Sequence, residues 1–274
     1  MKNIDLLIID PQNDFCDPKG SLYVNKAEKD MERISKLIDN IGDNINRIFV
    51  TLDTHYFYDI SHNVSYQNKK GENPPPFTIL NKEQIVNEEW FFIGRGSKLF
   101  NDLFNKTLIT YLEKLDENKR YPLCLWPPHC VVGTYGNSIY PILSDSLEKW
   151  MLKSKKNVNY ITKGMNVFTE HYSAIKAEVP DPLDKSTHFN RDLVFELEVA
   201  DTLLIGGEAG SHCVKSTVED IVDGFTLPEY IEKVVLLEDG MSPVSGFEDL
   251  QKRFMEDMIK KGMKIKKTTD LIII

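Results

Sequence analysis

The stretch with the clearest capacity for chemistry is residues 201–225, in which a cysteine stands between an apolar run and a helical pattern. Residues 202–205 are apolar and end at two glycines, which is typical of a strand buried in a parallel sheet. From residue 214, apolar residues recur at steps of three and four, which predicts a helix. Cys213 lies at or just before the start of that helix, where unpaired N–H groups and the helix dipole favour a thiolate. It is a candidate nucleophile, and the alternative is a buried thiol that only packs.

A carboxylate and a lysine follow two other predicted strands. Residues 4–9 form a nearly continuous apolar run that ends at Asp10 and the turn-forming residues after it. Ligands of open α/β sheets bind outside the carboxyl ends of the strands, so Asp10 is a candidate acid or base. A turn or capping role would explain an aspartate there equally well. Lys163 ends the predicted strand 158–162 and could be its charge partner, although most lysines are simply solvated.

Histidines and an aspartate after two further strands suggest a metal site. Asp53 and His55 follow the predicted strand 47–52, and alternate residues of an extended segment share one side, so both could face one divalent cation. His62 lies seven residues further on, and His129 lies on a proline-rich loop after an apolar run. The sequence pattern leaves open the alternative that these are ordinary surface histidines.

The predicted elements alternate between strands and helices. Short apolar runs predict strands at 4–9, 47–52, 121–125, 158–162, 202–205, 234–237 and 271–274. Apolar residues at helical spacing predict helices at 31–41, 99–115, 142–151, 192–198, 214–225 and 247–258. Such alternation predicts an α/β fold, a three-layer sandwich with a central, mainly parallel sheet covered by helices on both faces.

One stretch interrupts this alternation. Residues 67–120 are rich in Lys, Asn and Glu, contain three consecutive prolines and hold a single amphipathic helix. We therefore expect one domain spanning 1–274 with an inserted helical subregion at about 67–120. The apolar stripe of its helix could pack on the same core or on a second subunit, so a homo-oligomer stays open.

The composition limits the classes of partner that the chain could bind. The chain has 274 residues, 41% of them hydrophobic, and a net charge of −9, which suits a globular fold. It has no lysine or arginine cluster that could follow a phosphate backbone, so we expect no nucleic acid partner. The N-terminal apolar run is too short for a signal peptide or membrane span, which predicts a cytoplasmic protein without membrane contact. Four cysteines without a CxxC pair do not indicate a disulfide framework.

Together these residues resemble one family, the isochorismatase-like cysteine hydrolases, and within it the nicotinamidases. The resemblance spans nearly the whole chain and is carried by Asp10-Pro-Gln-Asn-Asp-Phe15, Asp53-Thr-His55, Trp126-Pro-Pro-His129-Cys-Val-x-Gly-Thr, Lys163-Gly164, Tyr172-Ser173-Ala174 and Gly207-Glu-Ala-Gly-Ser-His-Cys213-Val. The segment that begins at Trp126 is the most specific of these motifs.

The resemblance implies a role for each matching position. It implies Asp10, Lys163 and Cys213 as catalytic residues, and an oxyanion hole from the N–H groups of Ala209 and Cys213, next to a cis peptide between Glu208 and Ala209. It implies that the substrate is bound by Phe15, Trp126, Tyr172 and His212. It also implies one divalent metal ion, zinc first, with iron or manganese open, held by Asp53, His55 and His129, with His62 as a fourth ligand.

The implied activity is the hydrolysis of nicotinamide to nicotinate and ammonia through a thioester on Cys213. Two alternatives remain: a family amidase acting on another small amide, and a member that keeps the fold without activity. The isochorismatase reaction itself is disfavoured because it needs neither a cysteine nucleophile nor a metal.

Overall fold

The centre of the molecule is a six-stranded sheet. The structure is a computed structural model that describes residues 3–94 and 96–271. The strands lie in the order β10-β9-β8-β1-β2-β7, and all of their pairings are parallel. Their bounds are Ile4–Ile9 (β1), Ile45–Asp53 (β2), Asn159–Lys163 (β7), Thr202–Gly207 (β8), Val234–Leu237 (β9) and Lys264–Lys266 (β10). The apolar runs of β1, β8 and β9 are almost wholly buried, as a strand covered on both faces requires.

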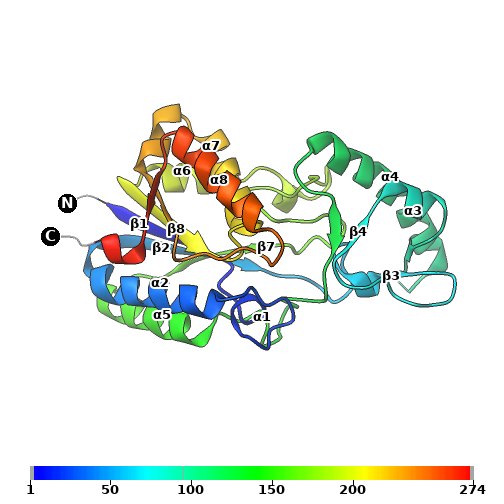
Figure 1. The fold of residues 1–274 in the computed structure, drawn as a ribbon, viewed down its shortest axis with the longest axis horizontal. Coiled ribbons are helices and arrows are strands. Elements are labelled where there is room, and N and C mark those ends of the chain that lie inside the picture. The colour runs from blue at the N-terminus through cyan, green and yellow to red at the C-terminus, as the bar shows by residue number, and fades with distance from the viewer. Residues whose placement is uncertain (1–2, 95, 272–274) are drawn as a thin grey trace.

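Helices cover both faces of this sheet (Figure 1). One face carries α2 (Ala27–Ile41) and α5 (Pro141–Ser154), which pack on each other. The other face carries α6 (Arg191–Glu198), α7 (Cys213–Gly224) and α8 (Glu248–Lys260). A short helix, α1 (Asn13–Cys16), follows β1. The predicted α/β fold with a central parallel sheet between two helical layers is confirmed.

Residues 60–125 build a second lobe beside the sandwich, which we call the accessory lobe (Figure 1). Its described elements are β3 (Tyr66–Gln67), β4 (Thr78–Leu80), α3 (Lys82–Val86), β5 (Phe91–Phe92), α4 (Lys98–Asn118) and β6 (Leu123–Leu125). Strands β3 and β5 pair antiparallel, as do β4 and β6. The lobe has an apolar core of its own, separate from that of the sandwich. The helix expected at 99–115 is present as α4, but the lobe also contains strands, which the sequence pattern did not predict.

The strand expected at 121–125 does not belong to the central sheet. Only 123–125 is extended, as β6, and it pairs antiparallel with β4 of the accessory lobe. The expectation that it joins the parallel sheet was wrong because a short apolar run can be buried in either core.

At the C-terminus, the predicted strand 271–274 falls mostly on residues 272–274, which lie outside the described residues, and Leu271 is not in a strand. Next to β9 the sheet ends at β10, whose Lys-Ile-Lys sequence has too few apolar residues to give a signal but suits an exposed edge.

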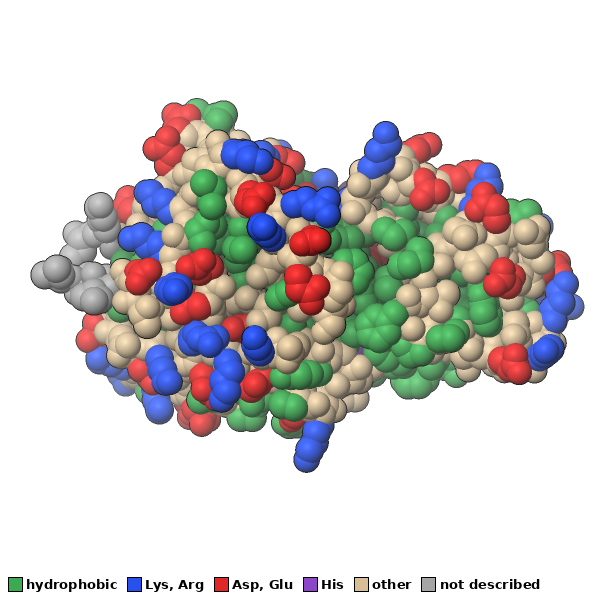
Figure 2. All heavy atoms as spheres, in the orientation of Figure 1, with side chains coloured by type: hydrophobic (Ala, Val, Ile, Leu, Met, Phe, Trp, Pro, Cys, Tyr) green, Lys and Arg blue, Asp and Glu red, His purple; other side chains and the backbone are tan. Residues whose placement is uncertain are grey.

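The surface reflects the two lobes. In Figure 2, charged side chains of both signs are interspersed over the sandwich, and hydrophobic side chains gather where the sandwich meets the accessory lobe. Over the described ranges, no helix combines the length and the apolar character needed to cross a bilayer.

Candidate active site

The predicted catalytic residues meet where the strand order reverses. From β1 the chain continues to β2 and β7 on one side, and then returns to β8 on the other side of β1. Asp10 directly follows β1, Lys163 is the last residue of β7, and Cys213 is the first residue of α7 after β8. Because all these strands are parallel, the three side chains lie at the carboxyl edge of the sheet. This reversal is the point at which open α/β sheets bind ligands.

One ammonium group connects the cluster. Lys163 Nζ lies 3.0 Å from Asp10 Oδ2 and 3.7 Å from Cys213 Sγ. It also donates to Asp53 Oδ1 at 2.8 Å and to the His171 carbonyl at 2.9 Å. Its side chain is only 1% exposed. The lysine therefore forms a buried bridge between the carboxylates and the thiol.

Asp10 is held in place by the neighbouring strand. Its N–H donates to Thr51 Oγ1 at 3.0 Å, and the Thr51 hydroxyl donates back to Asp10 Oδ1. The Asp10 backbone has a φ of 43°, a left-handed value that is uncommon for a residue other than glycine. Such conformations persist where surrounding contacts enforce them, and Thr51 on β2 supplies two of these contacts.

The surroundings of Cys213 act on its thiol in opposite directions. Burial raises the pKa of the Cys213 thiol well above its usual value; Lys163 opposes this shift, and Asp10 adds to it. Burial thus acts against the thiolate that the helix start was expected to favour.

The partners of the thiol are shifted as well. Burial also raises the pKa of Asp10, although Lys163 opposes the shift. For Lys163, burial disfavours the charge, but Asp10 and Asp53 outweigh it and raise its pKa well above the usual range. The lysine is thus a fixed cation, and the thiol needs a base.

Two backbone donors border the cavity beside Cys213. The peptide bond between Glu208 and Ala209 is cis, as the resemblance implies. Adjacent N–H groups are used internally: Gly210 N–H donates to the Ser242 carbonyl at 2.8 Å and Val214 N–H to the Ala209 carbonyl at 3.1 Å. Within residues 3–94 and 96–271, no acceptor is bonded to the N–H of Ala209 or of Cys213. Both residues line the cavity, so their donors are free for a ligand oxygen.

Three buried histidines form a cluster next to these groups. Potential ligand atoms of His55, His62 and His129 all lie within 4.8 Å of one another. Each Nδ1 is near an oxygen acceptor, namely Asp59 Oδ2 at 3.2 Å, the Phe57 carbonyl at 3.1 Å and the Pro127 carbonyl at 3.0 Å, respectively. An acceptor at Nδ1 favours the tautomer in which Nε2 is free to bind a metal. The side chains therefore fit a divalent metal ion, and His62 belongs to the set.

Asp53 joins this cluster to the lysine. Its Oδ2 lies 3.1 Å from His55 Nε2 and 3.3 Å from His129 Nε2, while its Oδ1 accepts from Lys163. The β2–β7 register places Asp53 directly opposite Lys163. Imidazoles with one carboxylate suit zinc, iron or manganese. All four residues predicted as metal ligands thus lie together.

The cavity at this site is small and largely closed. Its volume is about 30 Å³, which leaves room for about two water molecules. Its lining includes all four residues predicted to bind the substrate, namely Phe15, Trp126, Tyr172 and His212, together with Leu22, Val24, Asp53, His129, Lys163, Glu170, Ala209, Cys213 and Val244. Phe15, Tyr172 and His212 are each 4–6% exposed. A ring-sized ligand therefore requires some of these side chains to move outward.

Several residues at the site had no sequence signal of their own. Gln12 holds the Asp53 backbone from both sides, since Gln12 Nε2 donates to the Asp53 carbonyl at 2.6 Å and Gln12 Oε1 accepts from Asp53 N–H at 2.7 Å. Glu170 lines the cavity, and burial raises its pKa to about 7. Gln12 lies inside the first motif, so its position beside Asp10 could have drawn attention. Nothing in the spacing of Glu170, Thr51 or Asp59 distinguishes them from other polar residues.

These features define the class: an α/β sandwich protein with a buried cysteine, lysine and aspartate at the switch point of its sheet, beside a three-histidine metal-type cluster. No family model matches the sequence. The chain is 25% identical over 254 residues to the nicotinamidase of Saccharomyces cerevisiae, covering 92% of this chain and 94% of the yeast protein. Over nearly its full length the chain therefore matches a nicotinamidase in sequence.

Solved structures show the same fold. The yeast nicotinamidase Pnc1p has a TM-score of 0.62 at 22% identity, with 96% of this chain and 98% of that chain covered, and a second structure of it holds the inhibitor nicotinaldehyde. A nicotinamidase/pyrazinamidase from Acinetobacter baumanii has a TM-score of 0.63 at 21% identity, with 99% of each chain covered. The pyrazinamidase of Pyrococcus horikoshii, in complex with zinc, has a TM-score of 0.56 at 20% identity, covering 97% of this chain and 99% of that chain.

Proposed function

We propose that this protein is a metal-dependent amidohydrolase that uses Cys213 to convert nicotinamide to nicotinate and ammonia. The observation that carries the proposal is the buried cluster in which Lys163 Nζ lies near both Asp10 Oδ2 and Cys213 Sγ, beside three buried histidines. The yeast relative, named as a nicotinamidase and solved with nicotinaldehyde, supports the substrate class.

In the first half of the reaction, Asp10 acts as the base. Because burial raises the pKa of the Cys213 thiol, its proton must leave as sulfur attacks, and the Asp10 carboxylate can accept it. Lys163 offsets the negative charge that develops on sulfur. A C–S bond forms at the carboxamide carbon, and its oxygen accepts from the N–H groups of Ala209 and Cys213. When the C–N bond breaks, Asp10 gives its proton to the departing nitrogen, which leaves as ammonia.

In the second half, water hydrolyses the thioester. Asp10, again a carboxylate, takes a proton from the attacking water as the C–O bond forms. The C–S bond then breaks, the sulfur regains a proton, and the carboxylic acid is released. One amide and one water are consumed, and one acid and one ammonia are formed.

The substrate is held by the cavity walls and by the histidine cluster. Phe15, Trp126, Tyr172 and His212 provide aromatic surfaces that would pack against a flat ring. His55, His62 and His129, with Asp53, would hold one divalent cation, for which zinc is our first choice and iron or manganese are alternatives. When bound, the ion supplies a Lewis acid that can anchor the ring nitrogen of a pyridine. The zinc complex of the Pyrococcus relative supports this assignment.

We propose that residues 1–274 form one domain with an inserted subregion at about 67–120, which lies within the accessory lobe. We place the protein in the cytoplasm and leave open a homo-oligomer.

The test is an ammonia-release screen with purified protein over nicotinamide, pyrazinamide and other small amides. We expect release from nicotinamide, none from Cys213→Ala, and an acyl adduct on Cys213 when turnover of the wild type is quenched for mass spectrometry. An adduct on Cys130 or Cys16, or an active alanine variant, would rule out the assigned nucleophile. Preference for a non-pyridine amide would favour another family amidase, and no release from any amide a silent member.

A further inference from the structure

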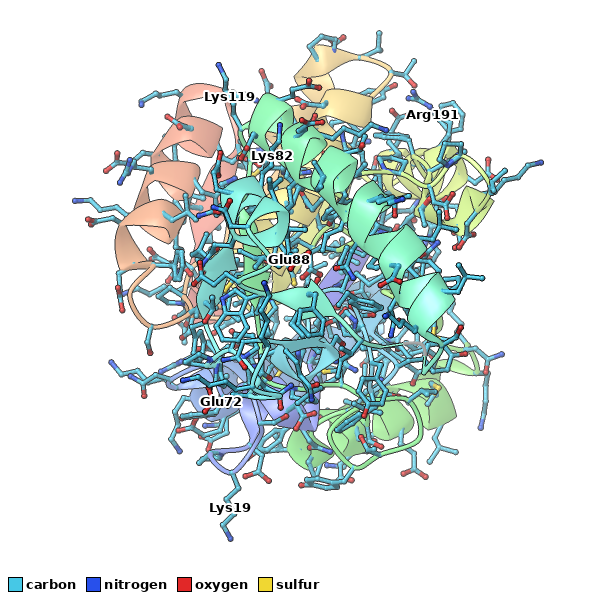
Figure 3. The ribbon with its side chains drawn as sticks, turned by 90° about the vertical axis from the view of Figure 1, so that its right-hand side faces the viewer. Lys19, Glu72, Lys82, Glu88, Lys119 and Arg191 are labelled. Atoms are coloured by element: carbon cyan, nitrogen blue, oxygen red, sulfur yellow. The ribbon has the colours of Figure 1, made fainter. Side chains whose placement is uncertain are left out.

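The accessory lobe reaches the nucleophile through two consecutive residues. We propose that Arg120 and Tyr121 are positioning residues that fix the start of helix α7 and thereby the place of Cys213. They follow directly on α4, whose end is marked by Lys119 in Figure 3. This inference rests on the proposed function only for its kinetic readout, because the reactivity of Cys213 can be measured without any substrate.

Helix α7 begins without a capping side chain. Its N-cap residue is His212, and no side-chain hydrogen bond caps the first turn. Helix starts are commonly fixed by such a bond, which satisfies one of the free N–H groups. Here the N–H of Cys213, the first residue of the helix, has to stay free for the ligand oxygen. The position of the first turn must therefore be set by contacts from outside the helix.

Arg120 supplies contacts to the first two turns of α7. Its Nη2 donates to the Ser216 carbonyl at 2.7 Å, and its Nη1 lies 3.3 Å from Asp220 Oδ2. The guanidinium is also 3.7 Å from carboxylate oxygens of Glu178 and of Glu219. Its side chain is only 16% exposed. A planar, mostly buried guanidinium with several partners sets the direction of a helix more firmly than a flexible lysine would.

Tyr121 holds the residues just before Cys213. Its hydroxyl donates to the Ser211 carbonyl at 2.8 Å. Its ring stacks on His212 with a centroid distance of 5.1 Å and an interplanar angle of 26°. The same ring lies 4.8 Å from that of Tyr172, which lines the cavity, and 5.1 Å from Lys215 Nζ. One buried side chain thus touches residues on both sides of the nucleophile and one wall of the cavity.

Residues of the sandwich contact the other side of the loop that precedes Cys213. Val244 N–H donates to Ser211 Oγ at 3.0 Å, and Gly210 N–H donates to the Ser242 carbonyl. The loop before Cys213 is therefore clamped between the segment 242–244 and Tyr121. Releasing one side would let Cys213 move relative to Lys163, whose Nζ is 3.7 Å from its sulfur. A misplacement on the order of 1 Å can cost about a hundredfold in rate.

The kinetic test uses Arg120→Met, Arg120→Lys and Tyr121→Phe. We expect kcat to fall about a hundredfold in Arg120→Met and about three- to tenfold in Tyr121→Phe, with KM for nicotinamide within about twofold of the wild type. Arg120→Lys should recover part of the loss because it keeps the charge.

The matched control is Arg47→Met. Arg47 is also a partly buried arginine that bonds a carboxylate, Asp5 at 2.6 Å, and a carbonyl, that of Glu196, but it lies at the start of β2, at the opposite end of the sheet. The Arg47→Met variant should be less stable than the wild type, and its folded form should keep the wild-type kcat. Equal kcat losses in the Arg47 and Arg120 variants, or an unchanged kcat in folded Arg120→Met, would overturn the proposal.

The substrate-free test is the rate at which iodoacetamide alkylates Cys213 at one fixed pH, followed by peptide mass spectrometry. We expect the rate to differ from the wild type by about threefold or more in the Arg120 and Tyr121 variants, and by less in Arg47→Met. If nicotinamide is not hydrolysed by the wild type, the proposed function fails while this measurement still decides the positioning role. If Arg120→Met does not fold, Arg120→Lys and Tyr121→Phe decide it, and rates within threefold of the wild type in both would refute the role.

Discussion

The two cores of this molecule differ in what they bury. At the carboxyl edge of its sheet, the sandwich buries charged side chains: Asp10, Asp53 and Lys163 are 0%, 3% and 3% exposed. Among the described residues 63–125 of the accessory lobe, no Asp, Glu, Lys or Arg side chain is buried, and the two buried phenol hydroxyls are hydrogen-bonded, Tyr66 to the Ile60 carbonyl and Tyr111 to the N–H of Glu170. Burying a charged side chain costs free energy unless the charge is paired, whereas burying an apolar side chain stabilises the folded state.

One core of this chain mainly contributes stability, and the other carries the side chains proposed for the chemistry. The charged end of the sandwich is retained at a cost in free energy, which is what the proposed reaction requires of its residues. The accessory core stabilises its own lobe and supports the segment that carries Arg120 and Tyr121. Changes in the two cores should therefore affect different observables, and the following experiments test that separation.

The largest effect is expected from the charged end. Asp10→Asn and Lys163→Met should each lower kcat by about 10⁴-fold, and the double variant by little more, because the residues act as one unit. Steady-state ammonia release from protein shown to be folded by circular dichroism measures this. Losses that simply add would mean that the two residues contribute independently.

Metal removal should have the next largest effect. Chelation should lower kcat/KM for nicotinamide by about 10²–10³-fold, mainly through KM, and benzamide, which lacks the ring nitrogen, should be a poor substrate even of the metal-loaded protein. His62→Ala should also lower the metal content measured by elemental analysis, whereas the exposed His188→Ala should not. Benzamide cleaved as fast as nicotinamide would contradict the metal-anchored substrate.

Truncation in the accessory core should act on stability. Leu108, on α4, is 0% exposed, and Leu108→Ala should lower the free energy of unfolding by about 3 kcal/mol through lost burial and the cavity left behind. Urea denaturation measures the loss. The kcat of the folded variant should stay within about twofold of the wild type. A collapse of kcat in folded protein would show that this core is not separable from the site.

The smallest effect concerns a carboxyl group between the lobes. Burial raises the pKa of Glu178 to about 7, although Arg120 opposes the shift. Since the folded-state pKa exceeds the unfolded value, the stability contribution is fully present below about pH 4.5 and is lost as the pH rises through about 7.

Glu178→Gln keeps the shape of the side chain and removes its ionisable carboxyl group. The loss of stability at high pH should therefore disappear. At pH 8 the variant should be more stable than the wild type by on the order of 2–3 kcal/mol, and near pH 4.5 the two should be equal. Thermal unfolding of both proteins from pH 4.5 to 8 measures the difference. A gain that does not depend on pH would show that the charge on Glu178 is not its cause.

Much of the sandwich could be predicted from local patterns. The runs that became β1, β2, β8 and β9 are mainly apolar, so each was visible without its neighbours, whereas β7 mixes polar and apolar residues. The accessory lobe was harder to predict. Its strands have two or three residues each, too few for a period to show, and β6 was assigned to the wrong sheet for that reason.

The residues of the site also differ in whether the sequence could predict them. Asp10, Lys163 and Cys213 could be placed at strand ends because parallel strands present their carboxyl ends at one edge. The contacts of Thr51, Gln12 and Tyr121 could not be foreseen, since each joins residues separated by 41 to 90 positions along the chain. Such contacts depend on strand order and loop paths, which leave no periodic trace in the sequence.

By itself, then, the sequence determined the α/β class, the strand ends that carry the reactive side chains, and the types of ligand available to a metal. These follow from local periodicity and from the chemistry of single residues. Only the tertiary structure decided that the strand order reverses between β1 and β8, that His62 joins the other two histidines, and that burial raises the pKa of the Cys213 thiol. Burial and the distances between charges set these properties, and both exist only once distant segments have packed together.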